Sequence, residues 1–471
     1  MERPVPHHEL ELDEDTLRRL LDEACSRIVE HVRTLGDQPA QNTAGGLDLA
    51  RRLAENAPET GTGFEGLLDD LFERIVPVSL NTAGPGYLGY IPGGGLLQSA
   101  VADLIAGAIN RYVGVWLPAP GLAQLELNVV RWLAEMTGLP EGTTGFLTTG
   151  GSIANLCAIV TARIDRLGES FGNGTLYASD QVHHSVTKAA RIAGIARDRV
   201  RAIPTDEHFR MRPAELERAI REDVDRGLTP FLVVASAGTT NTGSVDDLPE
   251  IGRIARDAGA WFHVDAAYGG FFHLTERGRT ALAGMGDADS LVVDPHKGLF
   301  LPYGTGALLV RDGSTLEAAF EETADYMPPA SDTSGLVSFS SISPELSRDF
   351  RGLRLWLPIK MHGVDAFRRA LDEKLDLARY AAERLRKIPG IEIVAEPELS
   401  IVAFRAAGPD DGPTRSLQKR INASKRVFVS STKLRGHQAI RICVLSFRTH
   451  RDRIDEILDL IESAMGELGS S

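Results

Sequence analysis

Three short runs of almost wholly apolar residues constrain the fold of this chain most strongly. FLVVASAG at 231–238, WFHVDAAYGG at 261–270 and SLVVDPHKG at 290–298 alternate with segments whose apolar residues recur at helical spacing. Strands that are apolar at nearly every position suit a sheet that is covered on both faces. The sequence therefore predicts an α/β fold with a mainly parallel central sheet flanked by helices.

The chain of 471 residues is long enough for two or three structural units. Helical spacing predicts an N-terminal helical segment, which we place at 1–85. A large domain is expected over 86–345, and it ends in a stretch rich in proline and serine, 321–345, that we interpret as a mobile active-site loop. Residues 346–471 combine a long helical pattern with short strand-like runs, which predicts a small α+β domain.

Composition and charge argue against several functional classes. The net charge is −14 and no basic run with interleaved aromatic residues occurs, so a nucleic-acid partner is not expected. No stretch approaches the roughly 20 apolar residues of a membrane helix, and the acidic start differs from a signal peptide, so we expect a cytoplasmic protein without membrane contact. The three cysteines lie far apart and match no zinc spacing, so no metal is expected.

Two charged residues stand directly after apolar runs, where ligands of open parallel sheets bind. Lys297 in DPHKG could form a Schiff base, and burial would lower the pKa of its amine and make it nucleophilic; a solvent-facing lysine is the alternative. Asp265 in HVDAAYGG would be costly to bury unless a cation accompanies it. The protonated ring nitrogen of pyridoxal 5'-phosphate is such a cation, and a structural cap is the alternative.

Three further motifs carry groups that this cofactor needs. Gly151 and Ser152 precede the helical pattern of 153–164, where free backbone N–H groups could bind a phosphate or Ser152 could be an ordinary N-cap. His183 could stack on an aromatic ring or have a structural role. Thr240 in GTTNTGS could form a wall for a cofactor edge or an ordinary turn. Together with the lysine and the aspartate, these groups match the needs of pyridoxal 5'-phosphate.

The motifs TTGGSIANL, SDQVHHSV, SAGTTNTGSVDDL, WFHVDAAYGG, DSLVVDPHKG and SPELSRDFRGLRLWLPIKMHG occur in this order along the chain. In this series the sequence resembles the group II pyridoxal-phosphate decarboxylases, the family of aromatic L-amino acid, histidine and glutamate decarboxylases. The resemblance covers most of the chain. It implies the aspartate aminotransferase-like fold type I, decarboxylation of an L-amino acid to carbon dioxide and an amine, and a homodimer with active sites at the subunit interface.

The resemblance also implies roles for single residues. Lys297 would be the Schiff-base lysine, Asp265 would lie at the pyridine nitrogen, and His183 would stack on the ring. Ala267 would contact the opposite face of the ring, and Thr240 would lie near the ring substituents.

At the phosphate, the resemblance implies contacts from Gly151, Ser152 and His296. Asp294 stands where many relatives have an asparagine near this group. An aspartate there would repel a dianion unless it were protonated or turned away, and the sequence offers no physical account of it. Arg448 is a candidate partner for the substrate carboxylate.

The sequence departs from the family pattern in the expected loop. Counting back from LSRDFRGL, Phe339 stands where relatives carry the tyrosine that protonates the carbanion, and a phenyl ring cannot donate a proton. In relatives, phenylalanine there accompanies oxidative deamination, so an aldehyde synthase is the first alternative. Tyr326, earlier in the loop, is another candidate donor. A cofactor-binding protein without turnover is the second alternative.

Overall fold

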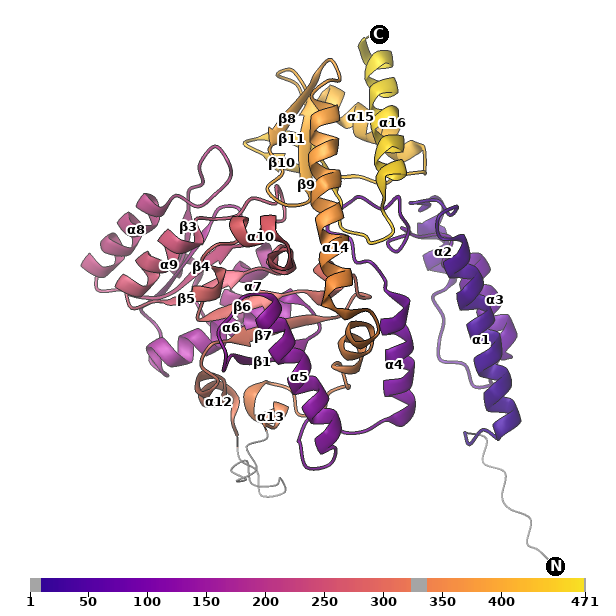
Figure 1. The fold of residues 1–471 in the computed structure, drawn as a ribbon, viewed down its shortest axis with the longest axis horizontal. Coiled ribbons are helices and arrows are strands. Elements are labelled where there is room, and N and C mark those ends of the chain that lie inside the picture. Colours follow the sequence, from indigo (N-terminus) through magenta and orange to yellow (C-terminus); the bar gives the residue numbers. More distant parts are fainter. Residues whose placement is uncertain (1–9, 323–336, 470–471) are drawn as a thin grey trace, which may run out of the picture.

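The structure, a computed structural model, describes residues 10–322 and 337–469. Figure 1 shows a central sheet between helices, a smaller sheet close to the C-terminus, and the first three helices to one side of both sheets. Within the described ranges, no helix combines the length and the hydropathy needed to cross a membrane.

The central sheet has seven strands in the order β1-β7-β6-β5-β4-β2-β3. Neighbours from β3 to β6 pair in parallel, and β7 alone runs antiparallel to its neighbours β6 and β1. The three apolar runs form β4, β5 and β6, which confirms the mainly parallel sheet. The strands are β1 (Thr144–Thr148), β2 (Gly174–Ser179), β3 (Val200–Ile203), β4 (Thr229–Ser236), β5 (Trp261–Asp265), β6 (Ser290–Val293) and β7 (Gly306–Val310).

Apolar cores on both faces of the sheet explain why these runs do not alternate with polar residues. Successive side chains of a strand point to opposite faces. In β6, Leu291 and Val293 therefore enter one core and Val292 enters the other. Helices α5, α8 and α9 contribute to the first core, and α6, α7 and α12 contribute to the second.

The helices and helical turns that accompany the central sheet have the following bounds. They are α4 (Leu97–Ile109), α5 (Pro120–Met136), α6 (Gly151–Leu167), α7 (His184–Ile192), η2 (Arg197–Arg199), α8 (Pro213–Asp225), α9 (Leu248–Asp257), η3 (Gly270–Leu274), α10 (Glu276–Ala281), η4 (Met285–Asp287), α11 (Pro295–Gly298), α12 (Ser314–Phe320) and α13 (Phe339–Ile342).

The two ends of the chain form separate groups of elements. The N-terminal group contains α1 (Glu14–Thr34), α2 (Gly46–Arg52), α3 (Phe64–Asp69) and the π-helical turn η1 (Asp70–Ile75). The C-terminal group contains α14 (Leu353–Leu385), β8 (Ile391–Ala395), β9 (Ile401–Ala406), α15 (Gly412–Ala423), β10 (Ser430–Leu434), β11 (His437–Cys443) and α16 (Arg451–Gly469). Its strands form an antiparallel sheet in the order β10-β11-β9-β8. The domain boundaries at 85 and 345 stay a prediction.

Most of the loop expected over 321–345, including Tyr326, lies outside the described residues. Its last part is ordered into α13, where the Phe339 side chain is fully buried in the core that also contains α6. The guanidinium of Arg348 lies 4.5 Å from the centre of the Phe339 ring.

A buried ion pair fastens the segment after α13 to α5, and hydrogen bonds from two arginines fasten it to β1. Arg348 lies 2.6 Å from Glu126 of α5, and both side chains are completely shielded from solvent. The second Glu126 oxygen accepts a hydrogen bond from the backbone N–H of Gly352 at 2.9 Å. Arg348 and Arg351 both donate to the carbonyl of Leu147. Since β1 leads directly into the glycine turn before α6, this network fixes the strand residues that precede that turn.

We expect Glu126→Ala to lower the free energy of unfolding by about 3–5 kcal/mol, because the substitution leaves the buried Arg348 guanidinium without its counterion. Urea unfolding followed by circular dichroism measures this loss. Glu135→Ala is the matched control on the same helix, where an exposed carboxylate lies 3.8 Å from Arg131. It should cost no more than about 1 kcal/mol. Equal losses for the two variants would contradict the importance of the buried pair.

Candidate active site

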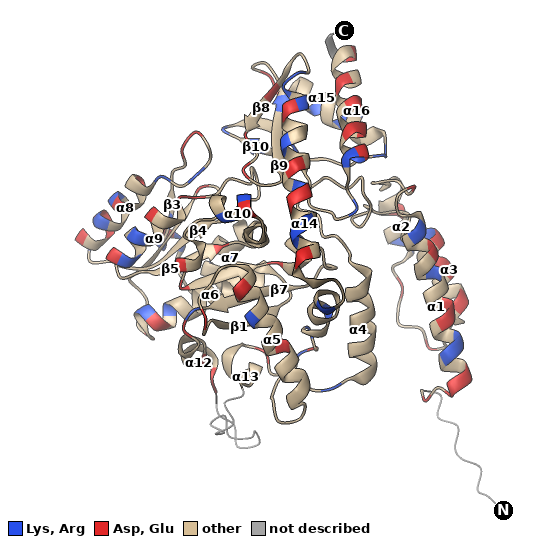
Figure 2. Cartoon of the chain, viewed as in Figure 1, with Lys and Arg blue, Asp and Glu red and all other residues tan. Residues whose placement is uncertain are grey.

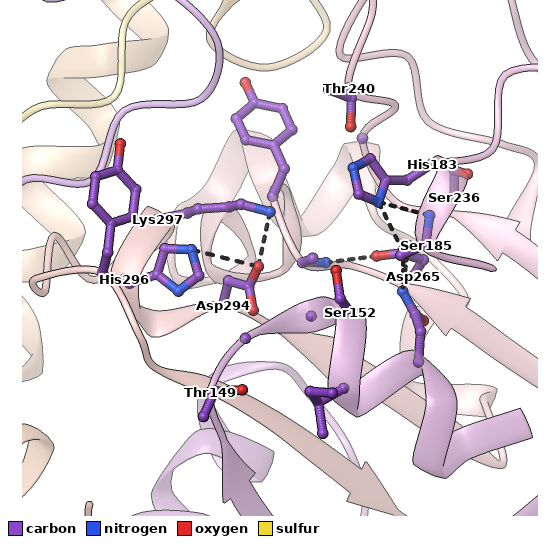
Figure 3. A pocket seen from close by; sticks show the side chains of 18 of the residues that line it. Thr149, Ser152, His183, Ser185, Ser236, Thr240, Asp265, Asp294, His296 and Lys297 are labelled. Carbon is purple, nitrogen blue, oxygen red and sulfur yellow. Dashed lines mark hydrogen bonds and ion pairs between the residues drawn. The ribbon is translucent and has the colours of Figure 1, made fainter. Parts of the chain in front are cut away.

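A cavity of about 380 Å³ lies at the carboxyl ends of the central strands (Figure 3). All nine residues predicted to bind a cofactor line it: Gly151, Ser152, His183, Thr240, Asp265, Ala267, Asp294, His296 and Lys297. Figure 3 shows His183, Ser185 and Asp265 grouped at one end of the cavity and Asp294, His296 and Lys297 at the other. The strand ends thus bring together motifs that are far apart in the sequence.

Lys297 lies on α11, the short helix that follows β6, and pairs with the aspartate three residues before it. Its Nζ is 2.8 Å from Oδ2 of Asp294. Burial lowers the pKa of Lys297, but attraction by Asp294 and their hydrogen bond outweigh burial, so the pKa is raised. The expectation of a lowered pKa was therefore wrong, because the sequence did not reveal that the neighbouring carboxylate faces the amine.

Asp294 is almost completely buried and has only one of its oxygens engaged. Oδ2 faces Lys297, whereas Oδ1 has no hydrogen-bond partner. Only glycine fits at position 306 beside this oxygen. A Cβ atom on Gly306 would lie 2.7 Å from Oδ1 of Asp294 and 2.6 Å from Cα of Gly150. The structure thus supplies the partner for Asp294 that the sequence could not identify.

Asp265 is the last residue of β5, and its buried carboxylate is held by two N–H donors. Oδ2 accepts from Nδ2 of Asn155 at 3.0 Å, and Oδ1 accepts from the backbone N–H of Ala267 at 3.2 Å. Among the described residues, no lysine, arginine or histidine lies within ion-pair distance of this carboxylate. A buried carboxylate of this kind lacks the cation that would offset its desolvation.

His183 caps α7, which is the structural role, and it also lines the cavity; stacking on an aromatic ring stays a prediction. Its Nδ1 lies 2.8 Å from Oγ of Ser185 and accepts from the backbone N–H of the same residue at 3.3 Å. Burial lowers the pKa of His183, and the negative charge of Asp265 raises this pKa by a smaller amount. The ring is therefore neutral at neutral pH.

The start of α6 lines one end of the cavity. Gly150 precedes the helix with a φ of 148°, a conformation that favours glycine, and the first N–H groups of a helix have no partners within the helix. A Cβ on Gly151 would lie 3.1 Å from Asp294 and 3.2 Å from the Ala267 methyl group. His296 lies beside this turn: its Nδ1 donates to the carbonyl of Thr305 at 2.6 Å, and its Nε2 lies 3.8 Å from Oδ2 of Asp294.

One buried arginine of the small sheet holds the Thr240 turn by hydrogen bonds. Arg441 of β11 donates to the carbonyls of Thr240 and Asn241 and to the hydroxyl of Ser430. It also donates to the carbonyl of Tyr90, a residue with a φ of 50°. One guanidinium therefore joins three segments at the edge of the cavity.

Two predicted residues lie elsewhere in the structure. Phe339 does not line the cavity, because its ring is buried in the core of its own chain and cannot contact a ligand there. Arg448 also does not line it, and its Nη1 donates to the carbonyls of Ala83 and Gly94. Its suggested role with a substrate carboxylate was an assignment from sequence position, and this geometry does not support it.

The cavity also contains residues that the sequence reasoning missed, notably Asn155, Ser185 and Tyr303. Asn155 had a signal: it stands one helical turn after Gly151, so both residues face the same side of α6. Ser185 follows His183 at the start of α7, a position typical of a capping group. Tyr303 lies in an irregular segment that has no periodicity.

The residues present fit pyridoxal 5'-phosphate. The buried Asp265 carboxylate suits a protonated ring nitrogen, and the α6 terminus with His296 suits a phosphate. The Nζ of Lys297 is an amine in the same cavity, the kind of group that an aldehyde cofactor needs. In the described part of the chain, no group of three or more histidine, cysteine, aspartate or glutamate side chains could hold a metal ion.

Comparisons with known proteins agree with this chemistry. The model of the pyridoxal-dependent decarboxylase conserved domain matches residues 47–407. The chain is 34% identical over 470 residues to the aromatic-L-amino-acid decarboxylase of Bacillus atrophaeus, with 98% of each chain covered. It resembles the structure of Oryza sativa TDC with PLP and tryptamine at a TM-score of 0.93 and 26% identity, covering 98% of this chain and 100% of that one. For the Rhodiola rosea 4-hydroxyphenylacetaldehyde synthase structure, the TM-score is 0.89 at 27% identity, with 97% and 99% covered.

We expect Asp294→Asn to speed the covalent loading of pyridoxal 5'-phosphate onto the apoprotein. Asp294 raises the pKa of Lys297, and a protonated amine cannot attack the cofactor aldehyde, so wild-type loading should accelerate as the pH rises. Removing the carboxylate should shift this profile to lower pH. Stopped-flow absorbance gives the loading rate, and Asp312→Asn at an exposed turn is the control. A wild-type profile in the Asp294 variant would disprove this role.

Proposed function

Because the chain belongs to the pyridoxal-dependent decarboxylase family, we propose that it decarboxylates an L-amino acid to an amine, with Lys297 as the residue that carries the cofactor. Membership confirms three predictions from the sequence: a fold type I architecture, a pyridoxal-phosphate-dependent carboxy-lyase, and pyridoxal 5'-phosphate as the cofactor. The observation that carries the proposal is the single cavity in which Lys297, Asp265, His183 and the start of α6 meet.

Bound pyridoxal 5'-phosphate supplies an electron sink for the electron pair that remains when carbon dioxide leaves. The protein sets the conditions for this chemistry. Asp265 would hold a proton on the ring nitrogen by its negative charge, and His183 would pack against the ring. The α6 terminus and His296 would hold the phosphate. At the reacting end, Oδ2 of Asp294 can take a proton from Nζ of Lys297 or return it across their 2.8 Å contact.

An aromatic L-amino acid is the substrate class that the relatives favour. The Bacillus atrophaeus relative is an aromatic-L-amino-acid decarboxylase, and the Oryza sativa structure contains tryptamine. Tyr303 adds an aromatic ring to the cavity of this chain, 5.6 Å from the ring of His296. Aromatic amino acids are therefore the first compounds to test.

An aldehyde synthase is the second candidate function. Two observations favour it: the phenylalanine at position 339 and the likeness to the Rhodiola rosea aldehyde synthase. The buried position of Phe339 in its own chain gives this candidate no direct support. A cofactor-binding protein without turnover is the third candidate.

We expect purified protein loaded with cofactor to release equal amounts of carbon dioxide and amine from an aromatic L-amino acid without oxygen uptake. Lys297→Ala should abolish this release, because the variant lacks the amine that anchors the cofactor. Lys360→Ala, at an exposed position of α14, is the control and should retain full activity. Aldehyde with oxygen uptake, peroxide and ammonia would favour the second candidate. Cofactor binding without turnover of any amino acid would favour the third.

The proposal includes a homodimer, because helices α1 and α4 expose apolar residues. Helix α1 has 21 residues and none of them is buried. Leu21 and Ile28 of this helix are exposed, as are Leu104 and Ile105 of α4. Figure 2 shows α4 almost free of charged residues, in contrast to the outer helices α8 and α16. Exposed apolar residues of this kind are typical of subunit interfaces, and a second copy of this chain is the expected occupant.

Sedimentation of the wild-type protein should give twice the chain mass of 51.0 kDa. The double variant Leu21→Asp and Ile28→Asp should sediment as a monomer, because a carboxylate is costly to bury in an apolar interface. It should also lose activity if the active sites lie at the interface. Val224→Asp, at an exposed apolar position of α8, is the control and should remain dimeric. A monomeric wild-type protein would contradict the proposed assembly.

A further inference from the structure

A buried series of hydrogen bonds leads from the first residue of β5 to the wall of the cavity. Trp261 donates through Nε1 to Oγ of Ser290 at 2.8 Å. The same hydroxyl lies 2.7 Å from Nδ1 of His263, which stands directly opposite Ser290 on the neighbouring strand. Nε2 of His263 lies 2.9 Å from Oδ1 of Asn155. All four side chains are at most 3% exposed, so water does not compete for these bonds.

At Asn155 the series divides into two branches that both reach the cavity. One N–H of the amide donates to Oδ2 of Asp265 at 3.0 Å, and the other donates to Oγ of Ser185 at 3.1 Å. The Ser185 hydroxyl in turn lies 2.8 Å from Nδ1 of His183. Asn155 is therefore the junction between the carboxylate and the histidine of the site.

On the first branch, Asp265 at one end and Trp261 at the other determine which group donates and which accepts in every hydrogen bond. An ionised Asp265 can only accept, so Asn155 must turn its NH₂ group toward it and its Oδ1 toward His263. Burial lowers the pKa of His263 to about 4, so this ring is neutral and its single proton must be on Nε2. Nδ1 then accepts from the hydroxyl of Ser290. That hydroxyl accepts in turn from Trp261, whose indole N–H can only donate, so both ends agree.

The second branch fixes the proton of His183 in the same way. The Ser185 oxygen accepts from Asn155, which leaves the Ser185 hydroxyl proton for Nδ1 of His183. The backbone N–H of Ser185 also points to this nitrogen. Nδ1 is therefore an acceptor, and the proton of the neutral His183 ring is on Nε2.

We propose that Asn155 is a positioning residue for the reaction, because it orients the Asp265 carboxylate and fixes His183 as the Nε2–H tautomer at the same time. His183 then presents a hydrogen-bond donor to the cavity and has no free acceptor nitrogen for removing a proton. The inference rests on the proposed function, because only bound cofactor gives Asp265 and His183 a common partner. The partners of Asn155 prevent its amide from rotating. A flipped amide would place Oδ1 against the Asp265 carboxylate and the NH₂ group against the Nε2–H of His263.

The tautomer can be measured directly on the wild-type holoenzyme. Long-range ¹H–¹⁵N spectra of histidine-labelled holoenzyme distinguish the two ring nitrogens, and His183→Gln identifies the signals of this ring among those of the 12 histidines. We expect a protonated Nε2 and an unprotonated Nδ1. A proton on Nδ1, or an equal mixture of the two forms, would overturn the inference.

Asn155→Asp tests the junction, because it keeps the size of the side chain and removes both N–H donors. The dissociation constant of the cofactor and its absorbance spectrum are measured first, then kcat and KM. We expect cofactor affinity and kcat to fall by about 10- to 100-fold, the usual effect of losing a group that orients a ligand-binding residue, with KM little changed. Asn155→Ala, which adds no charge, should have the same direction of effect.

Thr161→Val is the matched control, because Thr161 is equally buried on α6 but its hydroxyl bonds only to the carbonyl of Cys157. It should match the wild type in affinity and spectrum. If the asparagine variants fold and also match the wild type, the inference fails while the decarboxylase proposal stands. If the wild type binds cofactor with the expected tautomer but releases no carbon dioxide, the decarboxylase proposal fails and the positioning role of Asn155 stands.

Discussion

Burial of charge at the ends of β5 and β6 is the constraint on which the site depends. The central sheet is covered on both faces, so the carboxylates that follow these adjacent strands are shielded from water and need partners. Asp294 finds its partner in the amine of Lys297, and Asp265 is held by neutral N–H groups only. The two ends of the cavity therefore differ in character: one carboxylate is already neutralised, and the other is left for a cationic ligand.

Much of this arrangement could be predicted from the sequence, because strand position and ligand chemistry are local properties. The apolar runs predict β4, β5 and β6, and the carboxyl ends of parallel strands must meet at one edge. The partners of the site residues were not predictable. The approach of Asp294 to Lys297 depends on the turn into α11, and the contact of Asn155 with Asp265 joins residues 110 positions apart. Pairing across such distances appears only when the elements are packed.

Phe339 shows the limit of reasoning from sequence position alone. Its alignment with a loop tyrosine places it at the reacting centre, whereas the structure places its ring beneath the Arg348 guanidinium in an apolar core. The overall fold does not decide between amine and aldehyde as the product, because the chain resembles both the Oryza sativa and the Rhodiola rosea structures closely. The product depends on proton transfer and oxygen access at the cavity, which are set by side chains and not by the common backbone.

The joint at Arg441 restricts how the two sheets can move relative to each other. Its guanidinium holds the Thr240 turn, the Tyr90 segment and the small sheet by hydrogen bonds from a charged group, each worth about 1.5–3 kcal/mol. A hinge that swung the small sheet outward would have to break several of these bonds at once or carry the Thr240 turn with it. Any displacement of the small sheet is therefore coupled to the Thr240 turn, which lines the cavity.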